Sequence, residues 1–476
     1  MKEFDVIIIG TGPAGIFAAL EMADTGLKVL MLEKGRDISS RACPIHTKGT
    51  KCVHCKPCGI LCGWGGAGAY SDGKLTLTTE FGGMLDLYMD KPALMELIDY
   101  VDGIYLKFGA TQTVYGDDNK DAVRKIQKDA ASADLSLIPA RIRHLGTDKC
   151  LEILTLMRDH LEDKCTIRTS DGVSRIIVEN GCYVGVETTR GELFYSKYLI
   201  AAPGREGAEW FTGQVGQMGL ELITNPVDIG VRVEVPAVVM EQITDVVYES
   251  KLVYYTKSFD DRVRTFCMNP YGVVVAENNA GLITVNGHSN AEKSSENTNF
   301  AILVSKSFTE PFKEPITYGK SIAKLANLLS GGVIVQRLGD LKAGRRSTEE
   351  RIGRGMVTPT MKEATPGDLS LVLPYRHLIA IIEMLEALDK VAPGVGSRHT
   401  LLYGVEVKFY SSRLHLSNVL ETRIPNFFAV GDGAGVTRGL AQASVSGVIV
   451  AREIKKREHC NGGLPVIDSC PDALQL

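Results

Sequence analysis

The stretch Val6-Ile7-Ile8-Ile9-Gly10-Thr11-Gly12-Pro13-Ala14-Gly15 decides the fold of this 476-residue chain. Its four apolar β-formers predict a buried strand, and the Gly-x-Gly-x-x-Gly turn that follows opens a helix through Met22. A second predicted strand, residues 28–32, ends in Glu33. Strand, glycine turn, helix, strand and acidic residue in this order indicate a βαβ unit that binds a dinucleotide.

Each glycine of the turn has a physical task in such a unit. Gly10 permits the tight turn, Gly12 lets a pyrophosphate approach the backbone, and Gly15 allows close packing of helix and strand. The helix N-terminus offers free N–H groups and a positive dipole end to phosphates. We expect Glu33 to accept hydrogen bonds from a ribose. The expected contacts in this unit are Gly10, Gly12, Pro13, Ala14, Gly15, Glu33 and Lys34.

The composition is that of an ordinary enzyme rather than of a nucleic-acid or membrane protein. Hydrophobic residues make up 44%, charged residues 23%, and the formal net charge is -4. Basic residues are scattered, and no apolar run is long enough to cross a bilayer. The N-terminal apolar run leads into the glycine turn instead of a signal-peptide cleavage site. We therefore expect a cytoplasmic protein with a small-molecule substrate and no nucleic-acid or membrane partner.

The far end of the chain carries a second glycine-rich turn. Residues 427–435, Phe-Phe-Ala-Val-Gly-Asp-Gly-Ala-Gly, resemble the second FAD motif of the glutathione-reductase-like flavoproteins. The resemblance implies FAD, with Asp432 on the ribityl chain and the following helix directed at the flavin pyrimidine. The strand end at 200–204 resembles a third, internal motif, and Val173 sits where such proteins contact adenine. The contacts implied here are Val173, Gly204, Gly431, Asp432 and Ala443.

Longer stretches extend the resemblance to nearly the whole chain. Residues 63–75, 226–236, 336–348 and 431–447 resemble the family named only as FAD-dependent, or NAD(FAD)-utilising, dehydrogenases. This resemblance implies FAD and an oxidoreductase fold but no particular substrate. Residues 63–75 occupy the place where related flavoproteins run beside the isoalloxazine ring. The contacts expected from this segment are Gly66, Ala67, Ser71, Asp72 and Lys74.

The predicted architecture is an α/β fold, with a discontinuous Rossmann-like FAD-binding domain and an inserted, largely antiparallel β-rich substrate or cap domain. Residues 1–215 form the first part of the FAD-binding domain, with a Cys-rich loop at 41–63 and a helical excursion at about 85–163. Residues 216–365 form the β-rich domain. Residues 366–476 form a helical return and the second part of the FAD-binding domain.

Five of the 11 cysteines fall within the Cys-rich loop: Cys43, Cys52, Cys55, Cys58 and Cys62. The last four have the spacing of bacterial ferredoxin ligands, although no proline follows Cys62. A 4Fe–4S cluster would use four of the five and feed electrons to the flavin. The alternatives are a structural zinc, with His46 or His54 as substitute ligands, and metal-free thiols or a redox disulfide.

Residues for the chemistry itself are less clearly marked. No second strand–GxGxxG–helix unit is present, so we expect electrons from a transiently docking NAD(P)H or from an electron-carrier protein. Arg345 and Arg346 are candidates for clamping a substrate carboxylate, or else form a solvated basic turn. His288 is a candidate general acid, and Cys267 and Tyr271 are weaker candidates.

The predicted function is an FAD-dependent dehydrogenase or reductase that transfers hydride between flavin N5 and a small organic substrate. The alternatives are an electron-transfer flavoprotein subunit and a scaffold in which FAD is structural.

Overall fold

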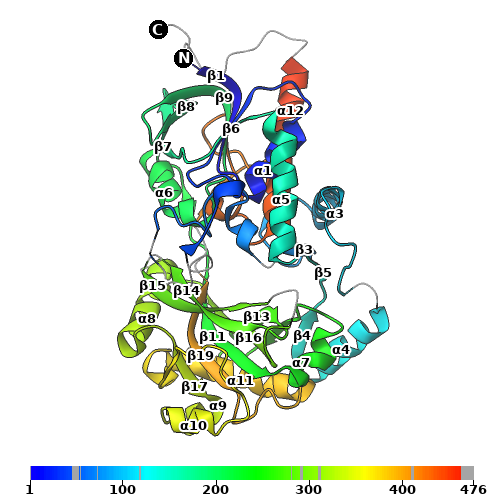
Figure 1. Cartoon of the computed structure of the whole chain (residues 1–476), viewed down its shortest axis with the longest axis vertical. Helices are drawn as coiled ribbons and strands as arrows, with labels where there is room; N and C mark the ends of the chain where they lie inside the picture. The colour runs from blue at the N-terminus through cyan, green and yellow to red at the C-terminus, as the bar shows by residue number, and fades with distance from the viewer. Residues whose placement is uncertain are drawn as a thin grey trace. The chain divides into compact units, whose positions relative to one another are not determined.

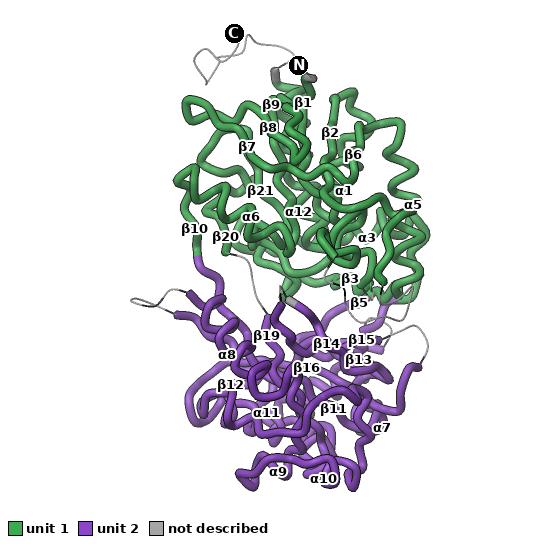
Figure 2. Tube along the Cα trace, turned by 60° about the vertical axis from the view of Figure 1, so that its left-hand side comes forward, with its two compact units in different colours: residues 1–113, 143–223, 411–476 green, residues 114–142, 224–410 purple. Residues whose placement is uncertain are grey.

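The computed structural model describes residues 2–44, 53, 55–71, 73–116, 119–279, 281–289, 293–308, 312, 314–408 and 412–461. The chain forms two compact units, coloured separately in Figure 2. Unit 1 comprises residues 1–113, 143–223 and 411–476, and unit 2 comprises residues 114–142 and 224–410.

Unit 1 is built on a seven-stranded sheet whose centre is parallel. β1 (Lys2–Ile9) pairs with β2 (Val29–Leu32) on one side and β9 (Leu193–Ala201) on the other, with β6 (Thr166–Arg168) beyond β2 and β21 (Phe427–Ala429) also on β9. The antiparallel strands β8 (Cys182–Thr188) and β7 (Val173–Glu179) extend the sheet. Because parallel strands end at one edge, the turns after β1, β2, β9 and β21 meet there.

Helices of unit 1 cover this sheet. α12 (Leu440–Asn461) lies beside α1 (Pro13–Met22) in Figure 1, and a Cβ on Gly447 of α12 would collide with the backbone carbonyl of Ala14. The two helices therefore touch backbone to backbone. The other helices and short elements of this unit are α3 (Lys91–Lys107), α5 (Thr147–Glu162), α6 (Gly204–Gln217), η1 (Ile38–Ser40), η2 (Gly66–Tyr70), η3 (Leu85–Leu87), η5 (Asp432–Ala434), β3 (Lys74–Leu77), β10 (Leu222–Ile223) and β20 (Arg413–Leu414).

Unit 2 is built on an eight-stranded sheet in the order β18-β17-β19-β11-β16-β13-β12-β4, antiparallel except for the pair β17–β18. Its central strand β11 (Val227–Pro236) alternates apolar residues on one face with Asp228, Arg232 and Glu234 on the other. The remaining strands are β4 (Leu135–Ile138), β12 (Lys251–Tyr255), β13 (Arg262–Asn269), β16 (Asn297–Lys306), β17 (Ile334–Arg337), β18 (Thr365–Pro366) and β19 (Leu401–Lys408).

The apolar face of this sheet packs against helices, and together they form the main core of unit 2. The helices that contribute buried residues are α4 (Lys120–Ser132), α7 (Ala237–Thr244), α8 (Pro315–Ser330), α9 (Leu338–Lys342) and α11 (Tyr375–Val391). A second apolar cluster joins the hairpin β14 (Val273–Asn279) and β15 (Leu282–His288) to β17 and β19. Two further short elements are α10 (Glu349–Gly353) and η4 (Leu369–Leu371). In the sequence, β5 (Arg141–His144) contains the point where the chain leaves unit 2 and returns to unit 1.

The predicted α/β fold, with its discontinuous Rossmann-like domain and antiparallel insertion, is confirmed, but the unit boundaries differ from the predicted ones. The β-rich unit runs over residues 224–410 instead of 216–365 and also includes residues 114–142. α11 and β19 belong to it because β19 pairs with β11. α4 and β4, expected in the helical excursion, belong to it because β4 extends the sheet at β12. Local patterns predict a strand but not its partner in the sheet.

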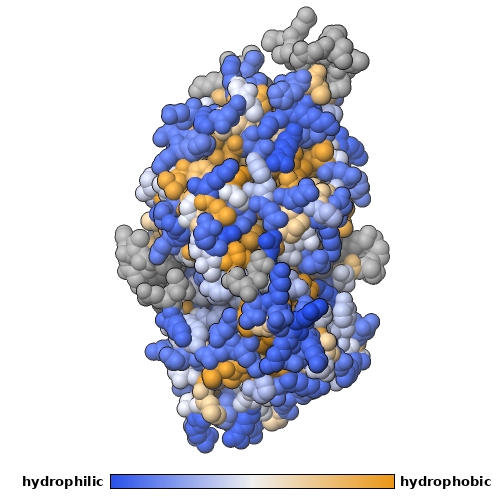
Figure 3. Space-filling model, turned by 90° about the vertical axis from the view of Figure 1, so that its right-hand side faces the viewer, coloured by the Kyte–Doolittle hydropathy of each residue, from blue (hydrophilic) through white to orange (hydrophobic). Residues whose placement is uncertain are grey.

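Hydrophilic side chains predominate on the face shown in Figure 3. Within the described part of the chain, no helix combines the length and the apolar character that a membrane span requires.

Candidate functional site

The turn after β1 is shaped by two glycines with different surroundings. Gly10 has φ +95°, and a Cβ there would collide with the carbonyl oxygen of Ala202, which follows β9. Gly12 is extended and caps α1, and the nearest atom to a Cβ on it would be Gly66 Cα at 4.0 Å. Gly10 is therefore required by the fold itself. Gly12 faces open space, as close approach of a ligand to the backbone requires.

The start of α1 provides the electrostatics that an anionic ligand needs. Pro13 occupies the first helical position, and the next N–H groups have no acceptor within the helix. The positive end of the helix dipole adds to them. Gly15 allows the tight approach, because a Cβ on it would collide with the Gly10 carbonyl. The tight-turn and packing roles expected of Gly10 and Gly15 are thus visible, while phosphate binding by Gly12, Pro13 and Ala14 stays a prediction.

The glycine-rich segment after the cysteines lies directly against this turn. The N–H of Gly65 donates to the Thr11 carbonyl at 2.8 Å, and a Cβ on Gly66 would lie 3.0 Å from Gly12 Cα. Gly66, in η2, therefore lies beside the dinucleotide turn, and Ala67 follows it in the sequence. The expected position of this segment beside the isoalloxazine ring stays a prediction. Ser71 follows η2 and its Oγ donates to the Gly68 carbonyl at 2.8 Å. Lys74 begins β3, and the predicted contact Asp72 lies outside the described residues.

The second glycine turn, after β21, meets the first one in space. A Cβ on Gly431 would lie 3.2 Å from the Ala14 side chain, and its N–H donates to Ser446 Oγ of α12 at 3.1 Å. A Cβ on Gly433 would collide with the carbonyl of Gly204, which follows β9. Segments more than 400 residues apart in the sequence are thus in contact at one edge of the sheet, as the paired FAD motifs require.

The polar groups of this turn are placed as follows. The Asp432 carboxylate accepts a hydrogen bond from Thr437 Oγ1 at 2.7 Å, and its other oxygen lies 3.9 Å from Arg205 Nε. Gly204 has φ +64° with open space around a Cβ. Ala443 is buried in the first turns of α12, and Val173 is half-buried at the start of β7. Their predicted contacts with FAD stay predictions.

Glu33, expected to bind a ribose, is only 6% exposed and holds three chain segments together. One carboxylate oxygen accepts from the N–H and the hydroxyl of Thr11 at 3.0 and 3.1 Å. The other accepts from the N–H groups of Gly35 and Gly63 at 2.8 and 2.9 Å. These four bonds use the acceptor capacity of a carboxylate. Ribose binding by Glu33 would have to replace one of them. The neighbouring Lys34 forms an ion pair with Glu206 of α6.

Arg41, a residue that no sequence motif marked, holds the backbone of residues 59–66, which includes Cys62. Its buried guanidinium directs its nitrogens at the carbonyls of Gly59, Ile60, Trp64 and Gly66, at distances of 2.5 to 3.2 Å. These five hydrogen bonds match the five donors of a guanidinium. Arg41 thus orders residues 59–66 through the backbone, whereas zinc binding by the cysteines stays a prediction. No sequence pattern marked Arg41, because a lone arginine has no characteristic spacing.

The cysteine segment is only partly described. Cys43 and Cys62 are buried, Cys58 is half-buried and Cys55 is exposed, whereas Cys52, His46 and His54 lie outside the described residues. Among the residues that are described, no three Cys, His, Asp or Glu side chains converge as metal ligands. Cys62 Sγ donates to Glu206 Oε2 at 3.4 Å, and burial raises the pKa of this thiol to about 11. Metal binding by Cys43, Cys52, Cys55, Cys58 and Cys62 stays a prediction.

The candidate catalytic residues lie in unit 2 on separate elements. His288 ends β15 and is half-buried. Tyr271 donates its hydroxyl to Glu241, which raises the pKa of the tyrosine. Cys267 has φ +49° where the pairing of β13 with β16 shifts register, and its carbonyl accepts from Arg232.

The two arginines expected to clamp a carboxylate differ from each other. Arg345 Nε donates to Asp340 at 2.9 Å, so part of its guanidinium is already engaged. Arg346 is exposed, and its carbonyl accepts from Arg351. Their action on a substrate stays a prediction.

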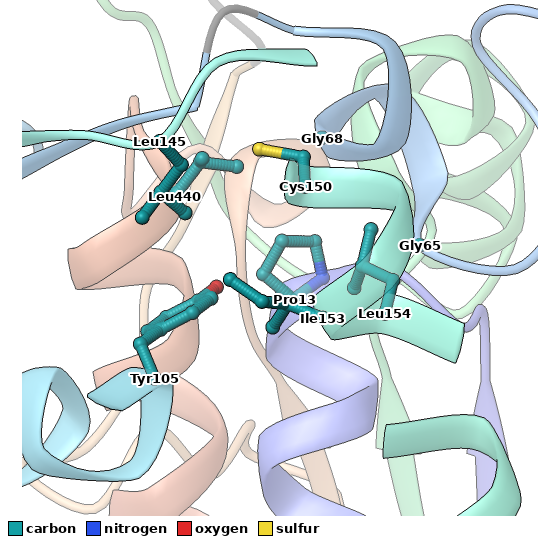
Figure 4. A pocket seen from close by; sticks show the side chains of 9 residues that line it. All are labelled: Pro13, Gly65, Gly68, Tyr105, Leu145, Cys150, Ile153, Leu154 and Leu440. Carbon is teal, nitrogen blue, oxygen red and sulfur yellow. The ribbon is translucent and has the colours of Figure 1, made fainter. Parts of the chain in front are cut away.

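A small cavity beside Pro13 does not add a ligand site. It has a volume of about 10 Å³, roughly the space of one water. Figure 4 shows that Pro13, Tyr105, Leu145, Cys150, Ile153, Leu154 and Leu440 surround it, with Gly65 and Gly68. Most of this lining is apolar, and the volume is far below that of a pocket for a small molecule.

Two family matches cover parts of both units. Residues 4–58 match the family described as "Pyridine nucleotide-disulphide oxidoreductase", which spans the first glycine turn and Glu33. Residues 226–409 match the family described as "FAD-dependent protein, C-terminal domain-like", which spans most of unit 2.

Similar proteins were found among curated sequences and among solved structures. An "Uncharacterized protein" from Clostridium beijerinckii is 28% identical over 475 residues, covering 94% of this chain and 80% of that protein. A geranylgeranyl bacteriochlorophyll reductase-like protein from Thermoplasma acidophilum has 15% identity and a TM-score of 0.41, with 97% of this chain and 80% of that chain covered. L-proline dehydrogenase from P. horikoshii has 12% identity and a TM-score of 0.41, with 96% and 94% covered.

The site geometry agrees with the match over residues 4–58, since the glycine turn of that segment meets the second glycine turn, 431–435, within unit 1. On the family matches, the chain is an FAD-dependent oxidoreductase.

Proposed function

We propose that this protein is an FAD-dependent dehydrogenase or reductase that transfers hydride between flavin N5 and a small organic substrate. The observation that carries the proposal is the meeting of two glycine turns, 10–15 and 431–435, beside the open Gly12. A protein that only needed a tight turn would have no use for a second glycine turn there.

The residues at this edge fit the shape and charge of FAD. Gly12 leaves room for a diphosphate, and the N-terminus of α1 favours its negative charge. Gly204 leaves room beside the turn after β9, and Asp432 offers a carboxylate to ribityl hydroxyls. Bound FAD supplies a carrier that takes or gives two electrons as hydride.

The chain's own residues would supply positioning and a proton. The Glu33 bonds to Thr11, Gly35 and Gly63 hold the glycine turn and the 63–70 segment in a fixed relation, so the site is preorganised. His288 is the candidate acid for the proton that accompanies hydride transfer. Arg345 and Arg346 are the candidates for holding an anionic substrate.

The electron source distinguishes the dehydrogenase from its alternatives. A transiently docking NADH or NADPH would reduce the flavin directly, whereas an electron-carrier protein would act through the cysteine segment holding a 4Fe–4S cluster. Zinc or free thiols in that segment would favour the nicotinamide. A flavin that no physiological donor reduces would favour a scaffold with structural FAD. The absorption spectrum of anaerobically purified protein, with iron, acid-labile sulfide and zinc assayed on the same sample, separates these cases.

The FAD site itself is tested by Gly12→Ala. The added methyl meets only Gly66 Cα at 4.0 Å, and the backbone of Gly12 suits alanine, so the chain should fold normally. A ligand at the backbone would meet that methyl, and crowding of about 1–3 kcal/mol corresponds to an affinity loss of about five- to 150-fold. FAD per polypeptide after dialysis, and the FAD dissociation constant, report the result.

Gly213→Ala in α6 is the matched control, since a Cβ there meets no atom within 4 Å. We expect full flavin in this variant. Full flavin retention by a folded Gly12→Ala protein would refute the site. Rapid reduction of the wild-type flavin by NADH or NADPH, mixed anaerobically, would then support the hydride-transfer function.

A further inference from the structure

Arg345 and Arg346, the candidates for holding an anionic substrate, belong to a strongly basic segment of unit 2. Residues 336–354 contain six arginines and lysines and three acidic residues, a net charge of +3 in a chain whose net charge is -4. The segment begins with the last two residues of β17 and includes α9 and α10, which lie side by side at one end of unit 2 in Figures 1 and 2. We call residues 337–351 the arginine loop.

The arginine loop is organised around one buried carboxylate. Asp340, fully buried, accepts from Arg337 at 3.0 and 3.2 Å, from Arg345 Nε at 2.9 Å and from Ser347 Oγ at 2.8 Å. Arg351 Nη1 lies 3.9 Å from the same carboxylate. Burial disfavours the charged form, but the hydrogen bonds from Arg337, Ser347 and Arg345 lower the pKa of Asp340 to about 2. One carboxylate cannot neutralise three guanidinium groups.

Several guanidinium donors of the loop are left facing solvent. The Arg345 side chain is 54% exposed and gives Asp340 only its Nε, and Arg346 beside it is exposed. The Arg351 side chain is 33% exposed. The exposed Arg398 lies next to the loop in space, since the Gly339 N–H donates to the Arg398 carbonyl at 3.1 Å, while Arg398 Nε bonds to His399 Nε2 at 3.2 Å. The excess positive charge is therefore accessible and held by a rigid base.

We propose that the arginine loop binds the phosphate group of a small molecule. A phosphate monoester carries about -1.5 to -2 charges at neutral pH and three acceptor oxygens. Guanidinium groups bind such a group bidentately, and several unneutralised arginines favour a dianion over a single carboxylate. Asp340 would act as a positioning residue, because its bonds to Arg337 and Arg345 fix the guanidinium groups before the ligand arrives. This inference rests on the proposed function in taking Arg345 and Arg346 as anion-binding residues, but its test measures phosphate binding and needs no reduction of the flavin.

The test is isothermal titration of the full-length holoprotein at constant ionic strength with inorganic phosphate, NADPH and NADH as separate probes. The variant R345Q/R346Q removes two exposed charges, and we expect its phosphate affinity to fall by about tenfold or more. The control K342Q/R354Q removes two charges from the same segment. Those two side chains pair with Glu386 and Glu350 instead of Asp340. We expect the control to stay within about twofold of wild type.

The outcomes separate the sources of phosphate. Tighter binding of NADPH than of NADH, lost in R345Q/R346Q, would support the proposal and identify a nucleotide 2′-phosphate. Binding of inorganic phosphate with no such preference would support the proposal with another phosphate compound as ligand.

Absence of phosphate binding to the wild type, or equal weakening by both double variants, would overturn the proposal. If R345Q/R346Q fails to fold, R346Q alone serves, since no hydrogen bond of its side chain holds the described loop together. If the single variants R346Q and R345K both fold and both bind phosphate as tightly as the wild type, that result would also count against the site.

Discussion

The buried ion pair between Arg232 and Glu406 should be the most sensitive polar interaction in unit 2. Both side chains are fully buried, and the guanidinium binds the carboxylate through two bonds of 2.8 and 2.9 Å. The same guanidinium donates to Asn299 at 2.8 Å and to the Cys267 carbonyl at 3.1 Å. Lys408, 15% exposed, is the second cation on Glu406, at 2.9 Å.

Glu406→Gln removes the carboxylate that pairs with both Arg232 and Lys408. Breaking a buried pair by removing one partner costs about 3–5 kcal/mol, because the other charge is left buried and uncompensated. For a unit of about 200 residues, 1 kcal/mol shifts Tm by about 2–4 °C, so we expect a decrease of about 6–20 °C. Glu386→Gln, at an exposed carboxylate 2.8 Å from Lys342, is the control and should cost less than about 1 kcal/mol.

The effect should also depend on pH with a defined sign. Burial opposes ionisation of Glu406, but Arg232 and Lys408 outweigh it and hold its pKa below the ordinary 4.5. A depressed carboxylate stabilises the fold above its unfolded pKa, and this contribution is lost as pH falls through the folded pKa. The difference between wild type and Glu406→Gln should therefore be largest at neutral pH and shrink in acid.

Calorimetry gives the midpoint, and hydrogen exchange in β11, β16 and β19 assigns it to unit 2. A Tm of Glu406→Gln within about 2 °C of the Glu386→Gln control at pH 7 would refute the reasoning, since it would place the pair in a solvated environment.

Two further predictions concern packing and protonation. In Gly447→Ala the new methyl would collide with the Ala14 carbonyl and lie 3.0 Å from Ala18 N. We therefore expect the free energy of unfolding in urea to fall by about 1–3 kcal/mol and FAD to be lost, whereas Gly213→Ala should be neutral or stabilising. Retained stability and flavin in Gly447→Ala would contradict the backbone contact between α1 and α12. His377 is 2% exposed with neither ring nitrogen hydrogen-bonded, and burial, with Lys306 nearby, lowers its pKa to about 4. Between about pH 6.5 and 4, only the unfolded chain then binds a proton at His377, so the free energy of unfolding should decrease as the pH is lowered through that window. His377→Leu should abolish this pH dependence and stabilise the protein by about 1–3 kcal/mol. An unchanged pH dependence in His377→Leu would show that other groups cause it.

Local sequence patterns predicted the elements that flank the two glycine turns. Four apolar β-formers before Gly10 predict β1, and the glycine spacing predicts the start of α1. The turn at 431–435 predicts β21 followed by α12. These signals are local, because a glycine at φ +95° or an exposed helix start constrains the residue types at that position alone. The family resemblance then placed the two turns in one site.

Only the tertiary structure decided which residues partner one another. In the folded chain β4, α4, α11 and β19 belong to unit 2, because β4 pairs with β12 and β19 pairs with β11. Pairing of strands distant in sequence depends on long-range hydrogen-bond register. The Glu33 carboxylate accepts hydrogen bonds from three backbone segments, and the Arg41 guanidinium donates to four carbonyls. Arg345 likewise donates to the buried Asp340. Charged side chains can reach many partners, and which one each satisfies depends on burial, which exists only after the chain has folded.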